Sequence, residues 1–176
     1  MSITSPTNTP GYFKVYIDLV DEETLAAAFT NQSIVIRDLL PSITEEKSVF
    51  AYAPGKWTLK EMLQHLIDAE RIFSYRAVCF ARKESQVLPG FNENDYAASS
   101  FANDRTWDSL LEEFVAVRRS TLLLFNSFNA EMLATTGKAG NNELSVQQVG
   151  YIIVGHFKHH IKIIKERYLQ ADSNEG

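Results

Sequence analysis

Three of the four histidines in this chain lie close together, in the stretch "GHFKHHIKII" at residues 155–164. His156 and His160 are four positions apart, a spacing that places two side chains on one face of an α-helix, with Cβ atoms about 5–6 Å apart. Two imidazoles in that arrangement can bind one metal ion at nitrogen–metal distances of about 2.0–2.1 Å. The fourth histidine, His65, would supply a third nitrogen if a facing helix carries it.

Helical geometry indicates which of these rings face the protein core. An α-helix turns about 100° per residue, so His160 falls about 40° from His156, within a stripe of apolar side chains such as Ile153. His159 falls at the edge of that stripe, and His65 lies at the border of the apolar face of its own helix, from which it can point inward. We therefore predict a metal site formed by His65, His156 and His160. Three protein ligands leave coordination positions open, as in catalytic zinc sites, and imidazole suits Zn, Ni, Cu or Fe.

An alternative is that the histidines are hydrogen-bonded core residues that bind no metal, since buried polar rings need partners. The sequence lacks an HExxH motif, which would place a general base beside a helical zinc site. We expect Asp68 and Glu70 to be surface groups or hydrogen-bond partners of the ligands, because their helical positions do not make either one an obvious fourth ligand. Cys79 is expected to be a small core residue. Arg76 points to the same side as His65, where an ion pair is the more common role and binding of an anionic substrate the other.

The elements that must position these residues are helices. Thr58 and Glu61 in "TLKE", and Ser145 and Gln148 in "SVQQ", have the pattern of a capping box at a helix start. We expect no strands, a turn-rich connection in "TTGKAGNNE", and a long, functional loop at 83–105 between the second and third helices. The pattern predicts an all-α four-helix bundle over residues 11–170, preceded by a flexible arm at 1–10 and followed by a tail at 171–176. Apolar residues recur at helical spacing in four segments: 21–40, 58–82, 106–128 and 145–169.

Composition excludes several classes of function. The chain has 176 residues, a net charge of −5 and a pI of about 5.4, so we expect no nucleic-acid partner. No apolar run approaches the roughly 20 residues needed to cross a bilayer, and the first residues do not have the pattern of a secretory signal. Cys79 is the only cysteine, which excludes an intramolecular disulfide and fits a reducing compartment. We expect a soluble, cytoplasmic protein with a small-molecule substrate.

Three stretches resemble the DinB-like (DNA-damage-inducible) family, also called the YfiT-like metal-dependent hydrolase group. The resemblance implies an up-down-down-up four-helix bundle, often a homodimer, that binds a divalent metal, typically nickel or zinc, through three histidines. His65 in "QHLIDAE" matches the family's ligand on the second helix, and His156 and His160 match the pair on the last helix. His159 has no counterpart among those ligands. The stretches are "YAPGKWTLKEMLQHLIDAERIFSYRAVCFAR", "LPGFNENDY" and "SVQQVGYIIVGHFKHHIKIIKERYL".

The resemblance leaves the reaction open. Members of the family include bacillithiol S-transferases and mycothiol-dependent maleylpyruvate isomerase, which activate a low-molecular-weight thiol on the metal. We therefore expect a metalloenzyme that activates either such a thiol or water. We favour thiol transfer because better-understood relatives carry it out, and because no general base is evident. A base for hydrolysis would come from the 83–105 loop, for instance Glu93 or Asp95. The alternative from another class is a non-catalytic stress-response or binding protein whose bundle is stabilised by the metal.

Overall fold

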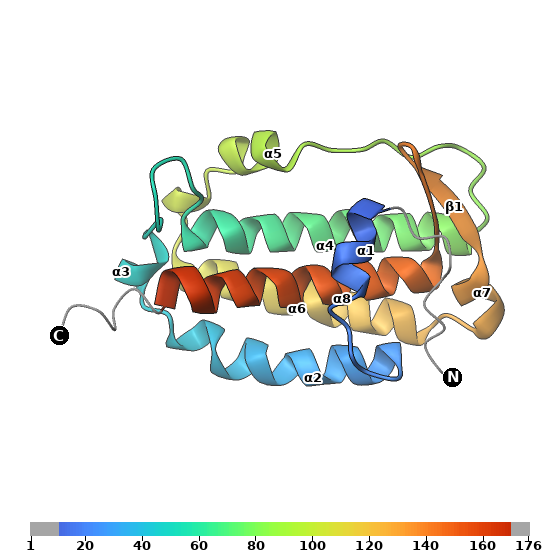
Figure 1. Cartoon of the computed structure of the whole chain (residues 1–176), viewed down its shortest axis with the longest axis horizontal. Coiled ribbons are helices and arrows are strands. Elements are labelled where there is room, and N and C mark those ends of the chain that lie inside the picture. Colours follow the sequence, from blue (N-terminus) through green and yellow to red (C-terminus); the bar gives the residue numbers. More distant parts are fainter. Residues whose placement is uncertain (1–10, 170–176) are drawn as a thin grey trace.

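The computed structural model of the chain describes residues 11–169, and its main body is a bundle of four long helices (Figure 1). The expected all-α four-helix bundle is therefore confirmed. The expected arm at 1–10 and the tail at 171–176 lie outside the described residues. None of the helices in residues 11–169 combines the length and the apolar content that crossing a bilayer requires. The long helices are α2 (Leu25–Asp38), α4 (Leu59–Ala81), α6 (Trp107–Asn126) and α8 (Val146–Ile163).

The long helices do not simply alternate in direction. In Figure 1, α2 and α8 run one way and α4 and α6 run the other. The start of α4 lies beside the π-helix η3 (Ile164–Leu169) that follows α8, where the Tyr168 hydroxyl donates to the Trp57 carbonyl oxygen at 2.6 Å. Because α4 and α8 are antiparallel, the early part of α4 and the late part of α8 share one level of the bundle. Helices α4 and α6 are parallel, because the residue numbers of their contacting side chains increase together. Arg71 contacts Glu113, and Ser74, further along α4, contacts Thr121, further along α6.

Two capping boxes fix where α4 and α8 begin. The Thr58 N–H donates to the Glu61 carboxylate at 2.8 Å while the Glu61 N–H donates to the Thr58 hydroxyl at 3.1 Å. Ser145 and Gln148 make the same reciprocal pair at the start of α8. Each box satisfies two backbone donors that a helix start leaves without partners. The two helices that carry the histidines therefore begin at defined residues.

Shorter elements surround the bundle and depart from the expected four helices. The turn-rich connection before α8 contains an antiparallel hairpin, so the expectation of no strands is wrong there. Its strands have only four residues each, too few for alternation to be visible, and packing holds them: a Cβ on Gly137 would lie 2.0 Å from the Phe80 ring. The additional elements are α1 (Gly11–Ile17), α3 (Glu45–Ser48), α5 (Glu93–Ser99), α7 (Ala130–Ala134), β1 (Thr136–Ala139), β2 (Asn142–Ser145) and two 3₁₀ turns, Leu40–Ser42 and Ala102–Asp104.

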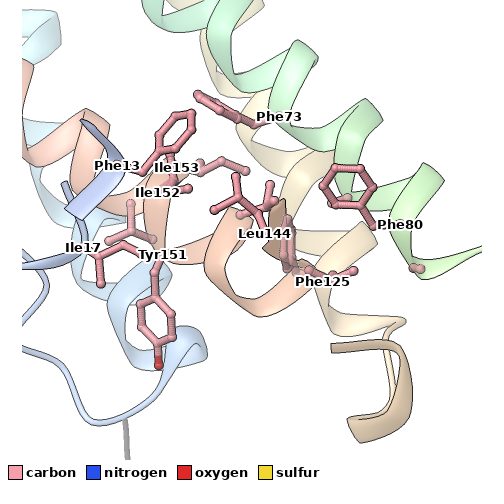
Figure 2. Packing of buried hydrophobic residues seen from close by; sticks show 14 of the residues in the cluster. Phe13, Ile17, Phe73, Phe80, Phe125, Leu144, Tyr151, Ile152 and Ile153 are labelled. Carbon is pink, nitrogen blue, oxygen red and sulfur yellow. The ribbon is translucent and has the colours of Figure 1, made fainter. Parts of the chain in front are cut away.

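Buried apolar side chains form two clusters along the bundle. The first, shown in Figure 2, joins Phe73 and Phe80 of α4, Phe125 of α6, Leu144 of the hairpin and Ile152 of α8. The second lies toward the other end and includes Leu63, Trp107, Phe114, Phe157 and Tyr168. Along α8 the first cluster extends to Val154 and the second begins at Phe157. His156 therefore lies at the boundary between the two.

A buried polar network connects all four long helices. Arg118 of α6 and Glu70 of α4 are each about 4% exposed and form an ion pair with three N···O contacts of 2.8–3.1 Å. Arg118 also donates to the Gln32 side chain of α2, whose amide donates to the Val154 carbonyl oxygen of α8 at 2.6 Å. Its position in the sequence had suggested that Glu70 is a surface group or a hydrogen-bond partner of the histidines. It is neither. The reason is that Arg118, far away in the sequence, supplies its counter-charge.

Breaking this ion pair should destabilise the fold strongly. Replacing Glu70→Gln leaves the Arg118 guanidinium buried without a counter-charge, and we expect the free energy of unfolding to fall by about 3–5 kcal/mol. Chemical denaturation followed by circular dichroism measures the change. Glu112→Gln, on the exposed side of α6, is the matched control and should shift stability by less than about 0.5 kcal/mol. Equal effects of the two substitutions would contradict the role given to the pair.

Candidate metal centre

The bundle brings three histidines together from two antiparallel helices. His65 lies on α4, and His156 and His160 lie one turn apart on α8. All three are buried, with 7–8% of each residue exposed. The Nε2 atom of His156 is 2.9 Å from Nε2 of His65 and 3.1 Å from Nε2 of His160. The three rings predicted from the sequence to converge therefore do so, while His159 remains half-buried outside the group.

The spacing of these nitrogens suits a single metal ion. Nitrogens that lie about 2.0–2.1 Å from a common ion are about 2.9–3.4 Å apart in octahedral or tetrahedral geometry. Two of the Nε2 pairs already have such separations, and one ligand atom from each ring lies within 4.8 Å of the others. Within residues 11–169 this is the only group of three or more histidine, cysteine or acidic side chains with that spacing. The donor set therefore fits a divalent ion.

Hydrogen bonding alone does not account for the cluster. Nε2 of a neutral imidazole carries either one N–H or one in-plane lone pair, so it makes one well-directed hydrogen bond. His156 Nε2 has two ring nitrogens within 3.1 Å and can pair properly with only one of them. Nδ1 of His160 is also buried without a hydrogen-bond partner among residues 11–169, so the hydrogen-bonding contact of that ring is at Nε2. A cation between the nitrogens satisfies all three lone pairs at once.

Burial keeps the three rings neutral. Desolvation lowers the pKa of His65 to about 4, although the charge of Glu93 acts in the opposite direction. Desolvation, reinforced by the neighbouring histidines, lowers the pKa of His156 and that of His160 well below the ordinary value. Neutral imidazole is the form that binds metals, because a proton and a metal compete for the same lone pair. At pH 7 the cluster is therefore ready to bind an ion.

Aromatic side chains hold the imidazoles in place. The Tyr16 ring of α1 meets His156 edge-to-face at 5.2 Å between centroids, and Trp57 packs on His65 at 4.9 Å. Helix α1 can approach this closely because α8 has a glycine at position 155, where a Cβ would lie 1.9 Å from the Tyr16 carbonyl oxygen. Neither α1 nor Tyr16 was predicted from the sequence. The available signal was the small residue Gly155, immediately before the first histidine of the pair.

Two cavities reach the histidines from different sides. One has a volume of about 310 Å³ and is lined by His156 together with Tyr16, Phe73, Arg76 and Glu93 among others. The other has about 250 Å³ and includes the following residues: Trp57, Met62, Asn94, His160 and Tyr168. The first residues of α5 line both, since Glu93 faces one and Asn94 the other. A larger hollow of about 550 Å³ between α2 and α8 contains none of the three histidines.

The structure shows which of the other residues considered from the sequence lie near the histidines. The 83–105 segment carries Glu93 to the cavity beside His156, whereas Asp95 is exposed and lines neither of the two cavities. Asp68 is half-buried and accepts a hydrogen bond from Gln64 at 2.9 Å. Cys79 is partly buried against the first apolar cluster, as expected for a packing residue. Of the acidic residues considered from the sequence, Glu93 is therefore the one placed to act at the histidines.

Comparisons with known proteins identify the family and the fold. A sequence model described as the DinB superfamily matches residues 29–164, most of the chain. A search of curated protein sequences finds no match. Among solved structures, the chain is similar to YfiT from Bacillus subtilis, described as a probable metal-dependent hydrolase with an unusual four-helix bundle topology. The TM-score is 0.68 at 14% sequence identity, over 97% of this chain and 94% of that one, a likeness that establishes the fold.

The lowered histidine pKa values predict how the metal-free protein responds to acid. A group whose pKa is lower in the folded state than the ordinary 6.5 binds more protons when unfolded, so stability is lost as the pH falls below about 6.5. With a folded pKa of about 4, His65 alone should reduce the free energy of unfolding by about 2 kcal/mol between pH 7 and pH 5. Urea denaturation in the presence of a chelator measures this. A His65→Gln variant should show a shallower dependence, and an unchanged slope would contradict the assignment.

Proposed function

The chain belongs to the DinB superfamily, and we propose that it is a metal-dependent hydrolase of a small molecule. The observation that carries the proposal is the convergence of three buried, neutral imidazoles beside a cavity that also contains a carboxylate. In this proposal His65, His156 and His160 bind one divalent ion, nickel or zinc. When bound, such an ion supplies Lewis-acid chemistry, which lets water or a thiol ionise near neutral pH.

Glu93 is proposed as the general base. It lines the cavity that His156 also lines, and its charge acts to raise the pKa of both His65 and Tyr16. Among residues 11–169 it makes no ion pair, so its carboxylate is available to accept a proton. The sequence had favoured thiol transfer because better-understood relatives carry it out and, in addition, because no base was evident. The position of Glu93 removes the second of these reasons and supports hydrolysis.

Tyr16 is proposed to position the substrate through its hydroxyl. Burial raises the pKa of its hydroxyl well above the ordinary value, and the neighbouring Tyr12 hydroxyl and then the charge of Glu93 add to that rise. The hydroxyl therefore stays protonated at neutral pH and can donate a hydrogen bond. Its ring covers His156, which limits the approach of solvent to the histidines from the side of α1. Tyr16 and Glu93 thus offer a donor and an acceptor on the same cavity wall.

Thiol transfer is the second candidate, because the histidines border two cavities. An S-transferase must bind two substrates, and His156 lines one cavity while His160 lines the other. A low-molecular-weight thiol in the cavity beside His160 and an electrophile in the cavity beside His156 would meet at the cluster.

A non-catalytic protein stabilised by the metal remains the alternative from another class. In that case metal would raise the thermal stability without turnover. A homodimer and a cytoplasmic location also stay predictions.

Metal content tests the site directly. We expect about one nickel or zinc ion per chain in protein purified without an affinity tag and reconstituted with either ion. In a His156→Ala variant the content should fall at least tenfold, because two ligands bind far more weakly than three. Elemental analysis after dialysis measures both. His159→Ala removes a neighbouring imidazole outside the cluster and should retain the metal; absence of metal from the wild-type protein would refute the proposed function.

The role of Glu93 is tested by activity with the metal still bound. Glu93→Gln should lower kcat by about 10²–10⁴-fold for hydrolysis of a panel of small esters and amides. Its metal content should remain at the wild-type level. Asp95→Asn, two residues further along and outside both cavities, is the matched control and should leave kcat within about twofold. Transfer to an added thiol that survives in Glu93→Gln, with no hydrolysis in either protein, would favour the S-transferase over the hydrolase.

A further inference from the structure

Arg76 is a buried cation without a counter-charge in the wall of the cavity beside His156. The residue is 5% exposed and lies on the same helix as His65. One guanidinium nitrogen, Nη2, donates to the Pro89 carbonyl oxygen at 2.9 Å. No aspartate or glutamate within residues 11–169 forms an ion pair with it, so the ion pair favoured from the sequence is not observed. By contrast, the other buried arginine, Arg118, has both a carboxylate and an amide as partners.

The surroundings of Arg76 hold its side chain in a fixed position. Its guanidinium carbon lies 5.5 Å from the centre of the Phe73 ring and 5.9 Å from that of Phe91, and the bond to Pro89 restrains one nitrogen. Burial lowers the pKa of Arg76, but an arginine with an ordinary pKa above 12 stays charged in proteins. The remaining N–H donors of the guanidinium have no acceptor among residues 11–169, and none of its nitrogens is sealed from solvent without a partner. They therefore face the cavity.

The same cavity connects Arg76 to the histidines. Phe73 packs against Arg76 on one side and lies 6.3 Å, centroid to centroid, from the His156 ring on another. Phe13 and Tyr12 complete an aromatic wall. A volume of about 310 Å³ is at the small end of the range for small-molecule sites, about 300–1,000 Å³. A ligand that fills it would therefore contact both the guanidinium and His156.

We propose that Arg76 binds the carboxylate of a small substrate whose apolar part lies against the aromatic wall and whose reactive bond faces the histidines. This inference rests on the proposed function and names its substrate class. A planar guanidinium presents paired N–H donors that match the two oxygens of a carboxylate. Burying the Arg76 guanidinium carries a desolvation cost that no ion pair within residues 11–169 offsets, and a bound carboxylate would offset it.

The charges of the cavity favour a singly charged anion over a phosphate ester. Arg76 is the only arginine or lysine among the residues that line it, and Glu93 contributes an opposing negative charge. In the metal-free protein one guanidinium balances one carboxylate, whereas a phosphate dianion would keep an excess negative charge facing Glu93. Five aromatic rings in the lining are suited to an apolar group on the same molecule, and they are Tyr12, Phe13, Tyr16, Phe73 and Phe91.

Binding can be measured without turnover. Phenylacetate, its neutral analogue phenylacetamide and inorganic phosphate serve as probes, titrated against the full chain by calorimetry or by NMR. Each titration is done on zinc-loaded protein and again after treatment with a chelator. We expect both forms of the wild type to bind phenylacetate at least tenfold more tightly than phenylacetamide. Arg76→Gln should lose that preference. Arg119→Gln, which removes an exposed positive charge from α6, should keep it.

The outcomes separate this inference from the metal site. Equal affinity for the acid and the amide in wild-type protein would refute the role of Arg76, as would a preference that Arg76→Gln retains. A preference that disappears with the chelator would mean that the carboxylate binds the metal instead, which also overturns the inference. Tighter binding of phosphate than of phenylacetate to the chelator-treated protein would overturn the substrate class. Arg76→Lys, which keeps the charge but not the paired donors, should bind phenylacetate more weakly than wild type and guards against loss of folding in Arg76→Gln.

Discussion

The position of every long helix depends on one buried ion pair. Arg118 and Glu70 are removed from water, which costs several kcal/mol per charge. That cost is offset by three N···O contacts within the pair, by the Gln32 amide, and by three aromatic rings within 5.0–5.5 Å of the guanidinium. Because Gln32 continues to the Val154 carbonyl, the network fixes the level of α8 relative to α4. Val154 lies two positions before His156, so a slip of either helix would separate the histidines as well as the charges.

The histidine cluster imposes a second constraint, since it puts three polar rings where apolar side chains would be more stable. Their pKa values are lowered because the surroundings cannot stabilise a charge. Functional sites commonly break the rules that the rest of a fold obeys, and the remainder of the structure compensates. Here the compensation comes from α1, which packs against α8 at Gly155 and covers His156 with Tyr16. Any larger residue at 155 would displace α1 and open the histidines to water.

The sequence predicts features that are encoded locally. Apolar periodicity indicates the long helices to within a few residues, the capping boxes mark the starts of α4 and α8, and the helical spacing of His156 and His160 selects them over His159. What the sequence does not predict depends on contacts between distant segments. Its sequence position predicts Glu70 to be a surface residue, and only the fold places Arg118, 48 positions away, beside it. The strands of the hairpin are too short to show alternation, and α1 is held by a close approach that only Gly155 hints at. Glu93 and Asp95 cannot be distinguished until α5 is placed over α4.

The cavity beside His156 is lined by one positive and one negative side chain, and this pair would suit the proposed hydrolysis of an anion. Arg76 provides a positive charge with unused donors, and Glu93 provides a negative charge that acts on His65 and Tyr16. The histidines are neutral, so they add no positive charge of their own to the cavity. A divalent ion at the histidines would increase the attraction for an anion, and Glu93 would offset part of that charge while accepting a proton. No acidic side chain among residues 11–169 forms an ion pair with Arg76. A substrate whose carboxylate binds Arg76 would then have its reactive bond, rather than its carboxylate, at the metal.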